Sequence, residues 1–242
     1  MVVETFRDKP ASFMTWNAVL ALQDFSSRVA FVPTTTRDFV QYERVRIPGV
    51  TPEYAIVANG GQIIVDGVKD EAWTAQVAEQ IRDLAAPAEV FDRVSRFAHG
   101  SPWLRTVKLT AGLFVCVAPE TGYTPPEEFI STVRAFAAGA GYQVSVQGRG
   151  KVYLIPNGVT KEAAAAEVAR RLGVTVTAAS GDSATDVGLM KWADIAIRPA
   201  HGELAEHGGS GLAVTARSGA VAGEDILAYV DSQITWHREA AA

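Results

Sequence analysis

Short apolar runs alternate with amphipathic segments along most of the chain. Residues 29–32 and 54–58 are continuous apolar runs, which predict strands buried on both faces, and residues 174–179 predict a further buried strand. Between them, apolar residues recur every three or four positions and predict helices, one capped by Thr15 and a later one by Thr160. Strands that alternate with helices in this way are typical of a parallel α/β sheet.

The middle of the chain follows a different pattern. Helical spacing over 73–84 precedes a predicted hairpin at 105–118, and a helix capped by Thr124 precedes two strands at 142–147 and 151–155. This repeated order of helix and hairpin is typical of a separate α+β module. We therefore predict one α/β core, formed by residues 1–67 and 156–242, with a domain inserted at 68–155.

Composition and charge narrow the class of protein. Hydrophobic residues make up 48% of the 242 residues and the net charge is −5, which is ordinary for a globular protein and argues against disorder. The absence of a basic block argues against nucleic-acid binding, and no apolar run is long enough to predict a membrane span. Residues 1–8 lack the apolar core of a signal peptide, so we expect a cytoplasmic protein. The single cysteine, Cys116, excludes an internal disulfide and is expected to pack in the core.

Polar loops follow three of the predicted strands, at 34–37, 59–61 and 181–186. Ligands of parallel α/β sheets bind beyond the carboxyl ends of the strands, so these loops are the candidate site. The last loop holds Asp182 and Asp186, which suit Mg²⁺ because this ion prefers oxygen ligands and often bridges to a substrate phosphate. The alternative is that one of these residues caps the helix and the other is solvated.

Two further residues suit an anionic ligand. Lys161 follows the Thr160 cap, where a cation opposes the helix dipole at a cost of about 0.3–1 kcal/mol. A bound anion would offset this cost, whereas the alternative is a plain surface lysine. Thr35 offers a hydroxyl, and its loop offers backbone N–H groups, to a phosphate oxygen; the alternative is an ordinary turn.

The order of these segments, 29–37, 58–61, 156–161 and 181–186, resembles the haloacid dehalogenase (HAD) superfamily. The resemblance extends from about Thr15 onward. It is greatest to the branch with a large cap between the second and third motifs, which includes sucrose-phosphate, mannosyl-glycerate-phosphate and Cof-type phosphatases. It implies a Rossmann-like parallel-sheet core with an inserted α+β cap that closes over the substrate.

The resemblance also implies roles for individual residues. Those expected to carry catalysis are Thr35, Lys161, Asp182 and Asp186, with the two aspartates holding Mg²⁺. Those expected to bind a small phosphorylated substrate are Thr35, Thr36, Arg37, Asn59, Gly60 and Lys161. Four cap residues are either contacts to the leaving group or solvated charges: Arg105, Lys108, Arg149 and Lys151.

One departure from the superfamily bears on catalysis. Its first motif, Asp-x-Asp-x-Thr, supplies the nucleophile and the general acid/base, and should precede the helix capped by Thr15. Residues 4–8 have the wrong types and spacing, and Pro199 stands where many relatives have Asn. We expect that the chain starts late, with residues 2–6 in the flap that follows the motif. The alternative is that the motif is lost.

These observations predict magnesium-dependent hydrolysis of a small phosphate monoester through an aspartyl-phosphate, and no turnover by the chain as given. The first alternative is a catalytically inactive HAD-like module that binds a phosphorylated ligand or a protein partner. The second is a dinucleotide-binding oxidoreductase, which needs a Gly-x-Gly-x-x-Gly turn after the first strand. The glycine-rich segment 208–211 lies late in the chain and follows no predicted strand.

Overall fold

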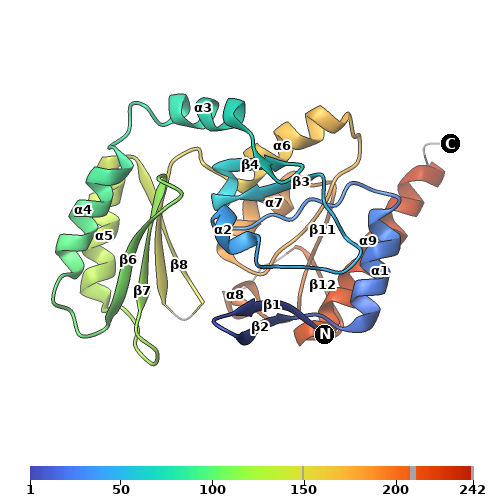
Figure 1. Cartoon of the computed structure of the whole chain (residues 1–242), viewed down its shortest axis with the longest axis horizontal. Helices are drawn as coiled ribbons and strands as arrows, with labels where there is room; N and C mark the ends of the chain where they lie inside the picture. Colours follow the sequence, from blue (N-terminus) through green and yellow to red (C-terminus); the bar gives the residue numbers. More distant parts are fainter. Residues whose placement is uncertain (149, 208–210, 241–242) are drawn as a thin grey trace.

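The computed structural model describes residues 1–148, 150–207 and 211–240. Arg149 and residues 208–210 of the glycine-rich segment lie outside the described residues. Figure 1 shows a sheet backed by helices on one side of the molecule, and an α/β core with the N-terminus of the chain on the other. In the described part of the chain, no helix is long and apolar enough to span a membrane.

The core contains a parallel sheet flanked by helices on both faces. Its strands β10 (Ala178–Ser180), β11 (Ile195–Arg198) and β12 (Ala213–Val214) are hydrogen-bonded in that order. Helices α1 (Trp16–Ser26) and α9 (Ala222–Ala240) pack together against one face (Figure 1), and α6 (Lys161–Leu172) and α7 (Val187–Trp192) lie together, with α7 against the sheet. The predicted α/β core with parallel strands is confirmed.

A second, antiparallel sheet holds the predicted polar loop at 59–61. It consists of β3 (Tyr54–Val57), β4 (Gln62–Val65) and β5 (Val68–Lys69), and the short helix η1 (Ala58–Gly60) joins the first two strands. Ile56 bonds in parallel to the segment before it: its N–H donates to Pro33 O (2.8 Å) and its O accepts from Thr35 N–H (2.9 Å).

The predicted strand at 29–32 is wrong as a regular strand, because only the 33–35 backbone pairs with β3. Among the described residues, no strand pairs with residues 29–32, and an extended segment without hydrogen-bonded partners is not a strand. The run at 174–179 is likewise shorter than predicted. Helix α6 ends at Leu172 with Gly173 as its C-cap, and Val174 and Val176 are exposed because β11, the partner strand, begins only at Ile195.

The chain begins with a hairpin of β1 (Val2–Phe6) and β2 (Lys9–Phe13), which turns at Arg7 and Asp8 in left-handed conformations. The remaining short elements are α2 (Phe39–Tyr42), η2 (Ala184–Asp186), α8 (Glu203–His207) and η3 (Gly219–Val221).

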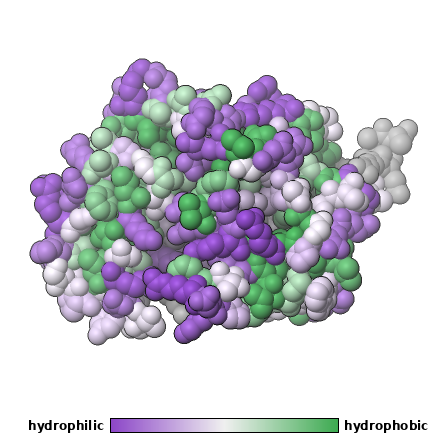
Figure 2. All heavy atoms as spheres, in the orientation of Figure 1, coloured by the Kyte–Doolittle hydropathy of each residue, from purple (hydrophilic) through white to green (hydrophobic). Residues whose placement is uncertain are grey.

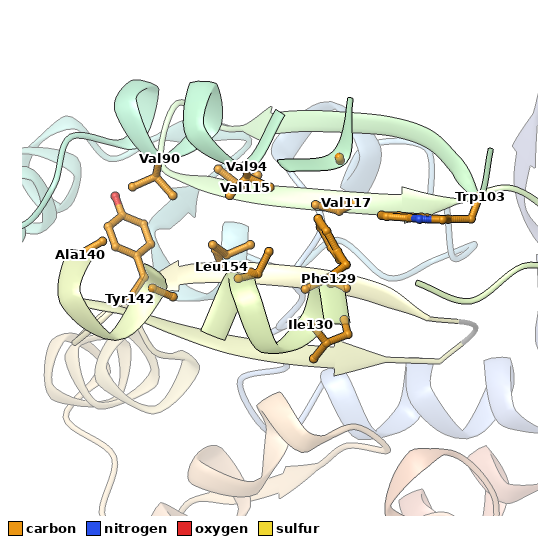
Figure 3. Packing of buried hydrophobic residues seen from close by; sticks show 14 residues of the cluster. Val90, Val94, Trp103, Val115, Val117, Phe129, Ile130, Ala140, Tyr142 and Leu154 are labelled. Atoms are coloured by element: carbon orange, nitrogen blue, oxygen red, sulfur yellow. The ribbon is translucent and has the colours of Figure 1, made fainter. Parts of the chain in front are cut away.

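The insert forms a four-stranded antiparallel sheet, here called the insert sheet, with strand order β6-β7-β9-β8. Its strands are β6 (Leu104–Thr110), β7 (Phe114–Pro119), β8 (Tyr142–Gln147) and β9 (Lys151–Pro156). Helices α4 (Pro87–Ala98) and α5 (Glu127–Ala140) cover one face, and Figure 3 shows the apolar side chains between them and the strands. The sequence patterns missed α4, and the predicted Thr124 cap is wrong because α5 begins after Pro126.

The first helix of the predicted insert packs against the core. Asp70 caps α3 (Glu71–Gln80) by accepting from Trp73 N–H at 3.0 Å, and its carboxylate also pairs with Arg171 of α6. Trp73 and Val77 lie in the same apolar cluster as Ile56 of β3. These contacts fix α6, which carries Lys161, against the β3 sheet.

Candidate active site

The N-terminal turn of α6 carries a buried cation. Thr160 Oγ1 accepts from Ala163 N–H at 3.2 Å, as predicted for the helix cap. The next residue, Lys161, is 4% exposed, and its Nζ lies 2.5 Å from Asp186 Oδ1 and 3.3 Å from Thr185 Oγ1. Because an ammonium group has three N–H donors, one is left for a further acceptor. The alternative of a plain surface lysine is therefore wrong.

Asp186 holds the loop that follows β10. Its Oδ2 accepts from the N–H groups of Asp182 (3.1 Å) and Ser183 (3.0 Å) and from Ser183 Oγ (2.8 Å). With Oδ1 paired to Lys161, both oxygens of this buried carboxylate have protein partners. Asp182, in contrast, is exposed.

This arrangement limits what the loop offers to a metal ion. Asp182 has an accessible carboxylate, which suits one oxygen ligand of Mg²⁺. Asp186 has no oxygen without a partner, so its place in a metal site stays a prediction. Among the described residues, no three His, Cys, Asp or Glu side chains are grouped to hold a metal. These residues supply a single ligand and do not form a complete magnesium site.

Asn59 links the β3 end of the site to α6. Its Nδ2 donates to Val159 O at 3.1 Å and its N–H donates to Thr35 O at 3.0 Å. The residue is buried, with φ of 58°, a left-handed conformation that Asn tolerates better than most residues. Its Oδ1 is buried and has no hydrogen-bond partner in the described part of the chain, which leaves one acceptor free at the site.

Gly60 allows this close approach. A Cβ on Gly60 would lie 2.1 Å from Thr160 O, and its own carbonyl accepts from Trp73 Nε1 at 2.9 Å. The backbones of η1 and of the residue before Lys161 are therefore in direct contact. Of the predicted residues, Lys161, Asp182 and Asp186 are thus brought together directly, and Asn59 and Gly60 lie against the residues before Lys161.

Thr35 and Thr36 lie on the loop after the 33–35 segment. Thr35 Oγ1 accepts from Arg37 N–H at 3.2 Å, which is an ordinary turn contact, while its backbone bonds to Asn59. No hydrogen bond joins its hydroxyl to Lys161 or Asp182 within the described ranges. The expected phosphoryl-binding role of Thr35 stays a prediction. Thr36 lies beside Tyr153 of β9, at the border with the insert sheet.

Arg37 is held by a residue that the sequence patterns missed. Glu4 of β1 is buried, and its Oε1 lies 2.9 Å from Arg37 Nη1 and 3.3 Å from Arg44 Nη2, while Ser12 Oγ donates to Oε2 at 2.5 Å. Burial by itself would raise the pKa of Glu4, but Ser12 and the two guanidinium groups outweigh it and lower this pKa below its usual value. The hairpin therefore anchors the predicted substrate-binding loop.

We predict that Glu4→Gln lowers the free energy of unfolding by about 2 kcal/mol at pH 7, because two partly exposed guanidinium groups lose their counter-charge. The pKa of Glu4 is lower in the folded state than in the unfolded state. The stability that its ionised carboxylate contributes is therefore present above the unfolded pKa of about 4.3 and is lost as the pH falls through the folded pKa. The difference between wild type and variant in urea unfolding should shrink from pH 7 toward pH 3. The exposed Glu120→Gln is the control, and equal costs for both variants would contradict the prediction.

Two hollows lie elsewhere. They have volumes of about 470 and 520 Å³ and share residues 49–53 near the amino end of β3. The candidate site follows the carboxyl end of this strand. The side-chain chemistry described above is therefore not in these hollows.

The comparisons with known proteins concern the fold. No protein-family profile matches the sequence, and no curated protein matches it. A sucrose-phosphatase from Synechocystis sp. PCC6803, solved with sucrose and phosphate, matches with a TM-score of 0.64 and 17% identity over 90% of this chain and 93% of its own. A protein from Thermoplasma acidophilum matches with a TM-score of 0.64 and 15% identity over 98% of this chain and 93% of its own.

A third match names the superfamily. It is a HAD subclass IIB sugar phosphatase, with a TM-score of 0.60 and 13% identity over 91% of this chain and 92% of its own. At these identities the likeness shows the fold. The chain has the HAD fold, a Rossmann-like core with an insert, as the sequence resemblance predicted.

Proposed function

We propose that this chain is a phosphatase-type hydrolase whose substrate is a small phosphate monoester, a sugar phosphate or a similar compound. With the nucleophile motif of the superfamily supplied, the reaction would be magnesium-dependent and would pass through an aspartyl-phosphate. The shared fold supports the reaction class, since two of the matched proteins are sugar-phosphate or sucrose phosphatases.

One observation carries the proposal: the nearly buried Lys161 ammonium on the first turn of α6, with one donor left over. A buried cation at a helix N-terminus is unfavourable unless anions compensate it, and Asp186 supplies one such charge. A phosphoryl oxygen would take the remaining N–H together with free backbone N–H groups of this turn. Its position beside Asn59 and the Thr35 loop supports the same site.

The remaining parts of the machinery are assigned as follows. Asp182 would be the magnesium ligand from this loop, and Asp186 would position it through the Asp182 N–H. The metal, when bound, supplies neutralisation of phosphoryl charge. The sequence contains no Asp-x-Asp pair, so the nucleophile has no candidate in the motif the superfamily uses. We therefore propose that the 242 residues bind the ester without turning it over.

The experiment is a p-nitrophenyl phosphate assay with Mg²⁺ on this chain and on a version extended by the codons that precede Met1 in its gene. We expect hydrolysis by the extended version alone. Robust hydrolysis by the 242-residue chain would contradict the motif assignment. Ester binding without hydrolysis by both versions would favour the alternative function, a non-catalytic module that binds a phosphorylated ligand.

Variants of the active version test the residues. Lys161→Gln and Asp182→Asn should each remove most of the hydrolysis under conditions where circular dichroism shows that the variant is folded. Lys191→Gln is the matched control, because this lysine is exposed on α7. Unchanged rates in the first two variants would remove those residues from the site.

A further inference from the structure

The insert sheet has two chemically different faces. In one row of paired residues, Val107, Val117, Val152 and Val146 lie side by side across the four strands. In the next row the neighbours are Lys108, Cys116, Tyr153 and Ser145. Because successive side chains of a strand point to opposite faces, the sheet has one apolar face and one polar face.

The polar face is turned toward the candidate site. Helices α4 and α5 cover the apolar face (Figure 3), which leaves the polar face on the side away from these helices. On that side Tyr153 lies beside Thr36 and Arg37, and β8 lies against η2, the turn that contains Asp186. Cys116, expected to pack in the core, is half-buried on this face. The polar face therefore borders both loops of the site.

The charge on this sheet is of one sign. Its four strands contain Arg105, Lys108 and Lys151 and no Asp or Glu, in a chain whose net charge is −5. None of these three cations takes part in an ion pair with any residue that the structure describes. Burial raises the pKa of the Cys116 thiol, and the charges of Lys151, Lys108 and Arg105 act against this rise, which places all three near that thiol.

The spacing allows two of these cations to meet one ligand. Lys108 and Lys151 lie on the two strands that flank β7, two rows apart and on the same face of the sheet. Strand spacing and residue rise put their Cα atoms about 12 Å apart. Two long side chains at this distance can converge on one anionic group. Figure 2 shows hydrophilic side chains gathered in the strip between this sheet and the core and around the β1–β2 hairpin.

We propose that Lys108 and Lys151 select phosphate monoesters whose leaving group carries a second anionic group, a carboxylate or a second phosphate. The inference rests on the proposed function, because it assumes that the ester phosphate lies at Lys161. It adds the substrate class: a neutral sugar phosphate would leave both ammonium groups without a partner. Charge-assisted hydrogen bonds from the two lysines would supply the discrimination.

The experiment compares three esters that differ at one position. Glycerol 3-phosphate has a neutral alcohol, 3-phosphoglycerate has a carboxylate, and glycerol 1,3-bisphosphate has a second phosphate. Calorimetric titration of the 242-residue chain measures binding and needs no turnover. We expect 3-phosphoglycerate and glycerol 1,3-bisphosphate, which carry a second anionic group, to bind about tenfold more tightly than glycerol 3-phosphate. This difference corresponds to one charge-assisted contact. Whichever of 3-phosphoglycerate and glycerol 1,3-bisphosphate binds more tightly identifies the second anionic group as a carboxylate or a phosphate.

Variants test the selectivity of Lys108 and Lys151 separately from the proposed function at Lys161. Lys108→Gln/Lys151→Gln should bring the three affinities within about twofold of one another without weakening the binding of glycerol 3-phosphate. Lys161→Gln should weaken all three. The matched control is Lys69→Gln/Lys191→Gln, which removes the same charge elsewhere. Equal affinities in the wild type, or a preference that survives in the Lys108/Lys151 variant, would overturn this inference alone. No binding of any ester would overturn the proposed function.

Discussion

Replacing Lys161 with methionine is expected to lower the free energy of unfolding by about 3–5 kcal/mol, because removing one partner of a buried ion pair leaves the other charge uncompensated. The affected partner is Asp186, which is 7% exposed and lies 2.5 Å from the ammonium group. Methionine has a similar length and adds no polar group, so the loss reports on the charge. Urea unfolding followed by circular dichroism measures it.

A second variant keeps this prediction testable if the first one unfolds. Lys161→Met/Asp186→Asn removes both charges, and the asparagine oxygen can still accept from the N–H groups of Asp182 and Ser183. We expect the double variant to recover more than half of the lost stability. Lys191→Met controls for the loss of an exposed lysine. A single variant as stable as this control would show that the Lys161–Asp186 pair is not formed in solution.

The pattern of the chain predicted most of the helices and strands because their signals are local. Apolar spacing and caps placed α1 and α6, including the Thr160 cap, and the continuous run at 54–58 placed β3. The order of the polar segments carried the resemblance to the HAD superfamily, and this resemblance placed Lys161 and Asp186 in one site without needing the exact strand limits.

The parts that could not be predicted depend on distant partners. The run at 29–32 has the composition of a strand, but a strand also needs at least one hydrogen-bonded neighbour, which sequence spacing does not reveal. The sequence patterns assigned no partner to Glu4, and only the folded hairpin shows that it holds Arg37 and Arg44. The sequence also did not reveal that both carboxylate oxygens of Asp186 accept hydrogen bonds, one from Lys161 and one from its own loop. These contacts limit the ability of Asp186 to bind a metal ion.

Gly60→Ala is expected to cost about 4 kcal/mol of unfolding free energy, the sum of backbone strain and overpacking. The backbone at Gly60 has φ of 93°, and a Cβ there would lie 2.1 Å from Thr160 O. This neighbour is backbone at the start of α6 and cannot rotate away. The helix terminus would have to move, and Lys161 with it, so the variant should also lose affinity for phosphate esters. Urea unfolding and calorimetric titration measure the two effects.

Gly67→Ala separates the two causes. Gly67 has φ of 77° but nothing within 4 Å of an added Cβ, so its variant carries the strain of a left-handed alanine without the collision. We expect it to cost about 1 kcal/mol and to leave ester binding unchanged. The difference between the two variants therefore measures how closely η1 approaches the residue before Lys161. If both variants cost the same, this approach does not exist in solution, and the contact that connects η1 to the residues before Lys161 is absent.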